Sequence, residues 1–335
     1  MVIQNASLKS LNTFGIEATA RYFSRFSSVQ ELDSIFKEYK EIPFLIMGGG
    51  SNLLLTQDFD GIVLRNEIMG KSILEETPDS VLVKIGAGEN WHEFVLWAVE
   101  NGFGGVENMS LIPGSVGASP MQNIGAYGVE IKDVFDHLFA YHIESGETHR
   151  FSLDECQFGY RESVFKRKLK NQYVISEVCF RLEKNRKVNT TYGAIKQELE
   201  NNSVSTPTIR DVSHAVIAIR QSKLPNPSEL GNAGSFFKNP VVDLAIADAI
   251  LEKFPSAPVY PSENGKKKLA AGWLIEQAGW KGKTVGTCGV HKLQALVLVN
   301  YGGSTGNQIY DLSSAIISDI HEKFGVTLER EVNIL

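Results

Sequence analysis

A glycine-rich stretch without charged residues, Asn108–Val129, is the part of the sequence best suited to bind a ligand. It reads NMSLIPGSVGASPMQNIGAYGV and contains no Asp, Glu, Lys or Arg. Glycine lets the backbone approach a ligand and present its N–H groups, so such a stretch can hold phosphates without a cation. Aliphatic residues such as Leu111, Val116 and Ile124 recur through it, whereas flexible Gly/Ser linkers lack them. We therefore predict a buried cofactor cradle rather than a linker.

A second glycine-rich segment, Gly48–Asn52, reads GGGSN and lies between two apolar runs. The preceding run, Phe44–Met47, fits a short buried strand. A strand that leads into three glycines and a Ser-Asn pair forms a turn whose amides can face an anion. The strongly apolar flanks make a mobile surface turn the weaker interpretation.

The segment Phe158–Lys166, FGYRESVFK, places Arg161 between aromatic residues. An exposed arginine is usually only solvated. Here Tyr160 and Phe165 flank it, which suggests that the guanidinium is held in place for an anionic ligand.

The segment Gly231–Pro240, GNAGSFFKNP, combines two glycines, Ser235, two aromatic residues and a lysine without periodicity. An ordinary turn would not need this composition, so we favour a functional segment. Ser235 is not within GxSxG, so a hydrolase nucleophile is not indicated.

Two partial motifs are rejected. Gly86 and Gly88 begin a GxGxxG pattern after a predicted strand, but Trp91 replaces the third glycine, so we expect only a strand-to-helix turn. Gly282-Lys283-Thr284 resembles the end of a P-loop, but Gln277 stands at the first glycine position and a helix precedes it.

The elements around these segments mix helices and strands, as in an α+β protein. We expect strands at Phe44–Met47, Ile62–Leu64, Val81–Ile85, Val134–Ile143, Thr148–Phe151, Tyr173–Leu182 and Ala295–Asn300. We expect helices at Leu32–Tyr39, Trp91–Val99, Thr208–Arg220, Asp243–Phe254, Leu269–Ala278 and Asn307–Phe324. The final segment, Gly325–Leu335, alternates like a strand. Its spacing places Glu329 and Glu331 on one polar face and does not choose between them.

Composition limits the protein class. The chain has 335 residues, enough for two or three domains, and a net charge of −6, which argues against a general nucleic-acid binder. Three separated cysteines fit a reducing compartment, and no histidine spacing indicates a metal site. The N-terminus lacks the features of a signal peptide, and no run is long enough to cross a membrane. We expect a cytoplasmic protein.

Four segments together resemble the UDP-N-acetylenolpyruvoylglucosamine reductase family, the flavin enzymes of bacterial peptidoglycan synthesis. They are GGGSNLLL at Gly48, SLIPGSVGASPMQNIGAYGVE at Ser110, GNAGSFFKNP at Gly231 and LEREV near the C-terminus. The TYGAI and KLAAGWLIEQAG segments resemble the longer, tyrosine-loop subtype. The resemblance covers nearly the whole chain.

The resemblance implies an α+β fold: a two-domain FAD-binding module of the vanillyl-alcohol-oxidase-like type and a C-terminal α+β domain for a UDP-sugar. The implied boundaries are 1–67 for the first FAD-binding subdomain, 68–223 and 325–335 for the second, and 224–324 for the substrate domain. FAD would be non-covalent. The implied cofactor-binding residues are Gly48, Gly49, Gly50, Ser51, Asn52, Ser115, Gly117, Gln122, Asn123, Gly125 and Arg220.

The implied reaction transfers hydride from NADPH through FAD to the enolpyruvyl group of UDP-N-acetylglucosamine enolpyruvate, and gives UDP-N-acetylmuramate. Ser235 would donate a proton, Arg161 would pair with the carboxylate and Glu331 would polarise the enolpyruvyl group. Implied substrate-binding residues are Tyr127, Tyr192, Lys223, Asn239, Tyr260, Lys268 and Gln294. We expect a monomer.

The sequence departs from the family pattern at a few positions. Ser119 and Met121 stand where small or aliphatic residues are expected, and Asn333 replaces a frequent arginine. Two alternatives are an FAD-dependent oxidase on the same fold and a non-catalytic nucleotide-sugar-binding protein. The first often attaches flavin through His or Cys, which both glycine-rich segments lack. The second predicts loss of Ser235, Arg161 or Glu331, and all three are present.

Overall fold

The structure is a computed structural model that describes residues 1–335 and divides into two compact units. The first unit contains Met1–Ala6, Ala20–Gly49 and Asp60–Ser222, and the second contains Ser7–Thr19, Gly50–Phe59 and Lys223–Leu335. The chain therefore passes between the units several times. The three-domain division implied by the family resemblance stays a prediction.

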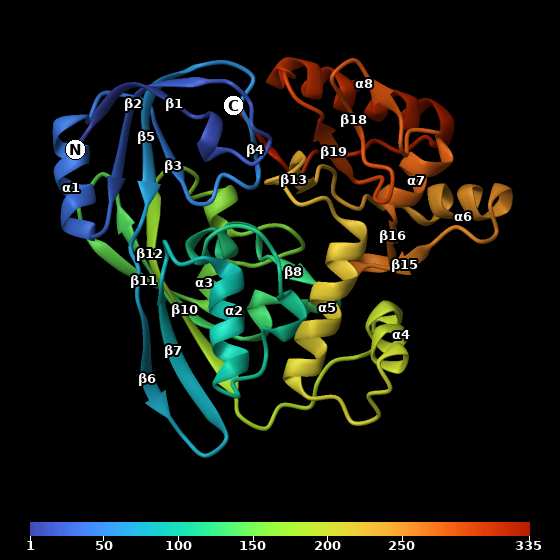
Figure 1. Cartoon of the computed structure of the whole chain (residues 1–335), viewed down its shortest axis with the longest axis horizontal. Coiled ribbons are helices and arrows are strands. Elements are labelled where there is room, and N and C mark those ends of the chain that lie inside the picture. The colour runs from blue at the N-terminus through green and yellow to red at the C-terminus, as the bar shows by residue number, and fades with distance from the viewer. The chain divides into compact units, whose positions relative to one another are not determined.

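A small sheet opens the first unit (Figure 1). Its strands are β1 (Ile3–Ser7), β2 (Thr19–Phe26), β5 (Phe59–Asn66) and β3 (Phe44–Met47), in that order. Helix α1 (Val29–Glu38) covers it and buries Leu32 and Phe36 against Ile62 and Leu64. The Ser28 side chain accepts a hydrogen bond from the Glu31 amide, which satisfies a free N–H of the first turn. The predicted helix and both predicted strands are confirmed here.

A five-stranded antiparallel sheet forms the centre of the first unit. Its order is β11 (Thr148–Ser152), β10 (Phe135–His142), β12 (Tyr173–Glu183), β7 (Ser80–Gly86) and β6 (Lys71–Glu76). One face packs on α2 (Trp91–Glu100), whose Phe94 ring stacks on Phe180 with centroids 5.0 Å apart. Four of these strands follow the predicted ranges within one or two residues. Strand β6 was not predicted, because every residue in it is exposed and it has no apolar periodicity.

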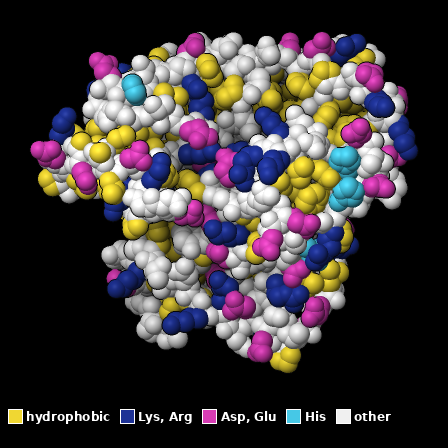
Figure 2. Space-filling view, turned by 180° about the vertical axis from the view of Figure 1, so that it is seen from behind, with side chains coloured by type: hydrophobic (Ala, Val, Ile, Leu, Met, Phe, Trp, Pro, Cys, Tyr) yellow, Lys and Arg dark blue, Asp and Glu magenta, His cyan; other side chains and the backbone are white.

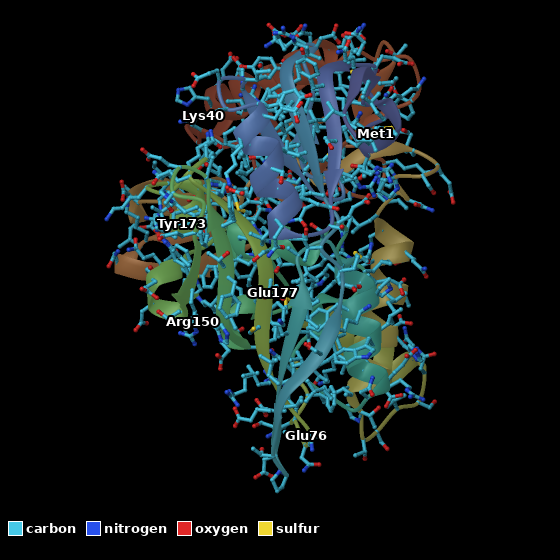
Figure 3. All side chains as sticks on the ribbon, turned by 90° about the vertical axis from the view of Figure 1, so that its left-hand side faces the viewer. Met1, Lys40, Glu76, Arg150, Tyr173 and Glu177 are labelled. Atoms are coloured by element: carbon cyan, nitrogen blue, oxygen red, sulfur yellow. The ribbon has the colours of Figure 1, made fainter.

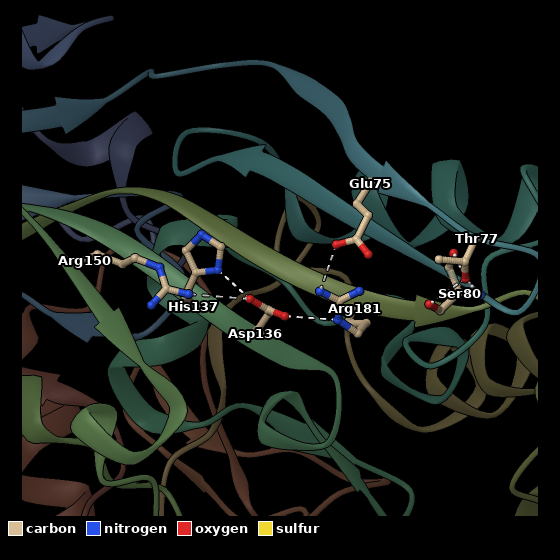
Figure 4. Close-up of polar contacts among 7 residues, drawn as sticks. All are labelled: Glu75, Thr77, Ser80, Asp136, His137, Arg150 and Arg181. Carbon is tan, nitrogen blue, oxygen red and sulfur yellow. Dashed lines mark hydrogen bonds and ion pairs between the residues drawn. The ribbon is translucent and has the colours of Figure 1, made fainter.

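The opposite face of this sheet carries charged and polar side chains. In Figure 3, Arg150 lies on β11 and Glu177 on β12, with β10 between these two strands, and Glu76 lies near the end of the β6–β7 pair. Asp136 on β10 accepts from the Nε of Arg181 on β12 at 3.1 Å, and Arg181 also reaches Glu75 on β6 at 3.4 Å (Figure 4). Ion pairs thus connect strands across the sheet on its polar face.

Helices α4 (Gly193–Asn201) and α5 (Ile209–Lys223) form a separate small core from Ile195, Leu199, Val212, Ala215, Val216 and Ile219. The predicted cap of α5 is confirmed. The Thr208 hydroxyl accepts from the Asp211 amide, and the Asp211 carboxylate accepts from the Thr208 amide at 2.8 Å.

The second unit contains two small sheets and three main helices. One sheet has the order β13 (Gly231–Ser235), β19 (Val297–Asn300), β18 (Cys288–Val290), β17 (Thr284–Val285). The other has the order β14 (Val241–Val242), β16 (Lys267–Leu269), β15 (Val259–Pro261). The helices are α6 (Leu244–Lys253), α7 (Ala271–Gln277) and α8 (Gly306–Phe324). Gly325 ends α8 in a left-handed conformation with φ 66°, which confirms the predicted stop.

Two predictions in the second unit are corrected. The helix expected to begin at Leu269 begins at Ala271, because Lys267–Leu269 pair as strand β16 with both neighbours. The C-terminal segment is strand only at β20 (Asn333–Ile334), which pairs with β4 (Leu53–Leu54). Its predicted apolar side is nevertheless buried, at Val326, Leu328 and Val332.

The remaining helical segments are short: α3 (Leu153–Cys156) and the 3₁₀ turns at Lys9–Leu11, Ile131–Asp133, Val164–Lys166 and Glu263–Gly265. No helix is long and apolar enough to cross a membrane, and no cluster of three side chains could ligate a metal. All three cysteines are buried and unpaired. Acidic and basic side chains are intermixed on the face shown in Figure 2.

Candidate active site

The predicted cradle is an ordered part of the first unit. It contains 3₁₀ turns η2 (Glu107–Met109) and η3 (Val116–Gln122) and the paired short strands β8 (Gly125–Ala126) and β9 (Val129–Glu130). Met109 and Val116 are fully buried in the core. Three non-glycine residues in it adopt left-handed backbone, Leu111, Asn123 and Tyr127, with φ between 44° and 59°. Such residues cost energy and persist only where neighbours hold them, so this loop has a defined shape.

A pocket of about 410 Å³ lies against this loop. All of its lining residues belong to the first unit: Ser27, Gly48, Gly49, Arg65, Asn66, Glu67, Met69, Gly88, Asn90, Gly114 and Ser115. The two glycine-rich segments therefore meet here, as the family resemblance implies for a shared cradle. Of the implied cofactor-binding residues, Gly48, Gly49 and Ser115 line the pocket.

Glycine is required where the two segments meet. A Cβ on Gly48 would collide with the Ser115 side chain, and one on Gly49 would lie 3.2 Å from the Cα of Gly114. A side chain at Gly48 would displace Ser115, and one at Gly49 would press on the Gly114 backbone, so glycine permits this close approach of the two segments.

Gly88 and Asn90 also line the pocket, although their segment was interpreted only as a strand-to-helix turn. A Cβ on Gly88 would collide with the backbone of Glu67. Asn90 caps α2 by accepting from the Glu93 amide at 3.1 Å, and it forms a bridge with Ser115. The partial GxGxx pattern was the available signal. Trp91 at the third glycine position excludes a dinucleotide fingerprint but not a contribution of Gly88 and Asn90 to the pocket wall.

The other implied cofactor-binding residues make internal contacts. Gly50, Ser51 and Asn52 lie in the second unit, where Gly50 has φ 62° and its carbonyl accepts from the Thr13 amide at 3.1 Å. The Asn123 amide donates to Glu130 and to the Gly159 carbonyl. Gly117, Gln122, Gly125 and Arg220 are in the first unit but do not line the pocket. Their contacts with a cofactor stay predictions.

Arg161 is held as the sequence suggests. It has a left-handed backbone, φ 55°, between Gly159 and Glu162, which pair with each other. Its guanidinium donates to the Gly125 carbonyl at 3.0 Å and lies 5.6 Å from the centre of the Tyr160 ring. A carbonyl of the cradle and an aromatic ring thus position this cation.

Tyr127 and Tyr192 are neighbours in the first unit. Their rings meet edge to face with centroids 5.1 Å apart. Burial raises the pKa of Tyr127, partly opposed by the adjacent positive charge of Arg220. Tyr192 is 51 % exposed at the start of α4, so this pair has one open side.

In the second unit, Ser235 and Glu331 belong to adjacent segments. Ser235 is exposed at the end of β13, opposite Val297, while Phe236 after it is fully buried. The Glu331 amide donates to the Phe236 carbonyl at 2.8 Å. The C-terminal segment is therefore fixed beside the segment that contains Ser235, although 94 residues lie between Phe236 and Glu331.

The structure separates the two glutamates that spacing left equivalent. The Glu329 carboxylate lies 2.5 Å from the Nζ of Lys238, and its side chain is 71 % exposed. Glu331 is half-buried, and its carbonyl accepts from the Asn52 amide at 3.4 Å. Both glutamates thus contact the Gly231–Pro240 segment: Glu329 through its carboxylate to the buried Lys238, and Glu331 through its backbone amide to Phe236, the residue after Ser235.

The implied substrate residues of the second unit fall in two places. Tyr260 and Lys268 are directly opposite each other on β15 and β16. Asn239 accepts from the first amide of α7, at Ala271, and the Gln294 side chain lies beside Gly272 in the same helix. Lys223 is the last residue of α5.

Comparison with known proteins identifies the family. A curated relative from Flavobacterium johnsoniae, UDP-N-acetylenolpyruvoylglucosamine reductase, is 54 % identical over 99 % of this chain and 98 % of its own length. This chain belongs to the UDP-N-acetylenolpyruvoylglucosamine reductase family. A relative of the same name from Pseudomonas aeruginosa is 48 % identical over 99 % of this chain and 98 % of its own.

Two family models match separate parts of the chain. The C-terminal domain of UDP-N-acetylenolpyruvoylglucosamine reductase matches residues 226–335, and an FAD binding domain matches residues 20–152. The reductase of Thermus caldophilus has a similar fold, with TM-score 0.69 and 22 % identity, over 100 % of this chain and 98 % of its own. A solvent-stable cholesterol oxidase matches with TM-score 0.50 and 12 % identity, over 99 % and 86 %. The α+β fold with a vanillyl-alcohol-oxidase-like FAD-binding module is confirmed.

The pocket fits the FAD of a UDP-N-acetylenolpyruvoylglucosamine reductase. Its walls are glycine backbone and polar side chains, together with one apolar side chain, Met69, and one charged pair, Arg65 and Glu67, at 3.3 Å. Turns walled by glycine backbone suit a diphosphate-bearing cofactor better than an apolar ligand. The matched FAD binding domain contains Gly48, Gly49, Gly88 and Ser115, all of which line the pocket.

Proposed function

We propose that this protein reduces the enolpyruvyl group of UDP-N-acetylglucosamine enolpyruvate to give UDP-N-acetylmuramate in peptidoglycan synthesis. It is an FAD-containing oxidoreductase, and NADPH is the hydride donor. Family membership over nearly the full chain supports this reaction. The observation that carries the residue assignment is the hydrogen bond between the Glu331 amide and the Phe236 carbonyl, beside Ser235.

Bound FAD supplies the hydride relay from NADPH to C3 of the enolpyruvyl double bond. Hydride addition at C3 leaves an electron pair at C2, conjugated with the adjacent carboxylate. The Ser235 hydroxyl donates its proton to C2. A hydroxyl is a weak acid, but a carbanion-like C2 is a much stronger base, so this transfer is downhill once charge develops. Ser235 is exposed and ends a strand, so its Oγ is accessible to a substrate.

Arg161 pairs with the substrate carboxylate. A guanidinium donates two parallel hydrogen bonds to a carboxylate and stabilises the charge that spreads onto it. Stacking on Tyr160 and the hydrogen bond to Gly125 restrict Arg161 to few conformations. Less conformational entropy is then lost when the substrate binds.

Glu331 polarises the enolpyruvyl group. A protonated carboxyl serves this role better than a carboxylate, because a negative charge would oppose the charge developing at C2. The remaining assignments are Lys223 and Lys268 for the diphosphate of the substrate and Tyr127, Tyr192 and Tyr260 for its base and phosphate oxygens. Asn239 and Gln294 complete the UDP-binding set. We also propose that the protein acts as a monomer in the cytoplasm and has the three-domain division given above.

The two alternatives make different predictions. An FAD-dependent oxidase would return its reduced flavin to the oxidised state with oxygen and not with the enolpyruvate. A non-catalytic nucleotide-sugar-binding protein would bind the UDP-sugar without any change in flavin absorbance. The presence of Ser235, Arg161 and Glu331 favours the reductase over the non-catalytic protein, and the absence of His and Cys from both glycine-rich segments argues against the oxidase.

An anaerobic titration followed by visible absorbance tests the proposal. The purified protein is treated first with NADPH and then with UDP-N-acetylglucosamine enolpyruvate. We expect flavin absorbance to bleach and then to return. A flavin that stays reduced would exclude this substrate, and a protein that cannot be loaded with FAD would overturn the cradle assignment.

A further inference from the structure

We propose that His92 is a positioning residue of the FAD cradle, which it shapes by fixing Leu111 through its ring Nδ1. The inference rests on the proposed assignment of the Asn108–Val129 loop to FAD. His92 does not line the pocket, so its action would pass through the loop.

Side chains hold both backbone polar groups of Leu111. The Leu111 amide donates to the Nδ1 of His92 at 3.0 Å, and its carbonyl accepts from the Nε of Arg220 at 3.2 Å. His92 is the second residue of α2, and Arg220 lies near the end of α5. Side chains from two helices thus hold Leu111, one at its backbone amide and the other at its backbone carbonyl. We call these two contacts the clamp.

Leu111 needs this clamp because its backbone is strained. Its φ of 59° is left-handed, a conformation that residues with a Cβ adopt only when neighbours impose it. Leu111 precedes the pocket-lining Gly114 by three residues. The first turn of α2 also fixes Gly114, since the Trp91 amide donates to the Gly114 carbonyl at 3.0 Å. His92 and Trp91 therefore anchor the two ends of the segment that leads into the pocket.

The contact requires a neutral imidazole. The Leu111 amide is a donor, so Nδ1 must be an unprotonated acceptor. Two charged groups face His92: Glu93 on its own helix and Arg220 from α5. Burial lowers the pKa of His92 from its ordinary value of 6.5, Glu93 acts in the opposite direction, and Arg220 lowers it further.

Well above pH 6.5 the His92 ring is neutral both in the clamped loop and in a released loop, so the clamp is at full strength. As the pH falls below 6.5, His92 in the released loop becomes protonated, whereas His92 in the clamped loop stays neutral to lower pH. Acid therefore favours the released loop, and FAD affinity falls in proportion to the fraction of protein with the loop in place.

Three variants test the inference by FAD binding, followed through the fluorescence of free flavin at pH 8 and at pH 5.5. His92→Leu removes the acceptor at similar size. His92→Asn keeps an acceptor oxygen at the same distance from Cβ, and this acceptor does not titrate in that range. His214→Leu is the matched control, since His214 is exposed on α5.

At pH 8 we expect His92→Leu to bind FAD about tenfold more weakly, equivalent to about 1.4 kcal/mol. His92→Asn should stay within about threefold of the unchanged protein. Between pH 8 and pH 5.5 the unchanged protein should lose affinity more steeply than His92→Asn. The control should match the unchanged protein at both values.

Unchanged FAD affinity in His92→Leu, or identical pH profiles for the unchanged protein and His92→Asn, would overturn the inference. If His92→Leu does not fold, as judged by circular dichroism, the comparison of the two pH profiles still decides it. A further variant, Gly49→Val, distinguishes an error in the role of His92 from an error in the assignment of the cradle to FAD. A valine at this position would press on the Gly114 backbone in the pocket wall. If Gly49→Val also retains FAD, the cradle assignment itself is wrong. If it loses FAD while His92→Leu does not, only the role of His92 is wrong.

Discussion

The Nζ of Lys238 lies 2.5 Å from the Oε1 of Glu329, and the two side chains differ sharply in exposure, 9 % against 71 %. The ammonium group of a buried lysine needs a partner to offset its lost hydration. Backbone pairing places the two residues together, since the Lys238 amide donates to the Glu329 carbonyl at 2.9 Å. This ion pair joins the GNAGSFFKNP segment to the C-terminal segment, which gives Glu329 a structural role.

The first prediction concerns this pair of glutamates. Glu331→Gln should leave flavin reduction by NADPH within about twofold and slow reoxidation by the enolpyruvate by about 10²-fold or more, since it alters a group that acts in the transition state. Glu329→Gln is the matched control. It should lower stability but leave the second half-reaction nearly intact. Anaerobic stopped-flow absorbance measures both steps, and the opposite result would exchange the two roles.

The second prediction concerns Ser235. Ser235→Ala removes the proposed proton donor, so reoxidation by the enolpyruvate should slow by about 10²- to 10⁴-fold while reduction by NADPH stays near normal. Ser34→Ala, on an exposed position of α1, should change neither step. Equal loss of both half-reactions in Ser235→Ala would reject the donor assignment.

The third prediction concerns Arg161. Arg161→Lys keeps the positive charge but cannot make the forked contact with a carboxylate, so kcat/KM for the enolpyruvate should fall about tenfold or more. Arg167→Lys tests a neighbouring arginine whose Nη2 donates to the Gln157 carbonyl at 3.1 Å. Steady-state rates measured at varied enolpyruvate concentration give kcat/KM for both variants. A normal rate in Arg161→Lys would remove this residue from the site.

The fourth prediction concerns the polar face of the sheet in Figure 4. Burial raises the pKa of the Asp136 carboxyl, but hydrogen bonds from His137 and Arg181 outweigh it, so the net pKa is lowered. The stabilisation is therefore complete above the unfolded-state pKa near 3.8 and is lost as the pH falls through the lower folded-state value.

Asp136→Asn should accordingly reduce the free energy of unfolding at pH 7 by about 1–3 kcal/mol, and this difference should shrink below about pH 4. Urea unfolding at both pH values measures it. Asp60→Asn, at a side chain that is 87 % exposed, should have little effect at either pH. A difference that does not depend on pH would show that packing, and not charge, is responsible.

Local signals were enough to predict much of the fold. Strand β3 was predicted with its observed bounds, helix α5 with its N-cap Thr208 and helix α8 with its stop at Gly325, because capping residues and apolar periodicity act within a few residues of each other. Strand β6 and the strand character of Gly231–Ser235 were missed. Both depend on pairing with distant strands rather than on their own sequences.

The sequence by itself determined which residues are of types suited to the chemistry. These are the glycines of the Asn108–Val129 and Gly48–Asn52 segments, one serine, one arginine and two glutamates. Only the tertiary structure decided which of them meet. It brought Gly48 and Gly49 to Ser115, added Gly88 and Asn90 to the pocket, and engaged Glu329 with Lys238. The physical reason is that helix caps and turns are set by interactions between near neighbours. Close backbone approach and the partner of a buried charge depend on segments far apart in the chain.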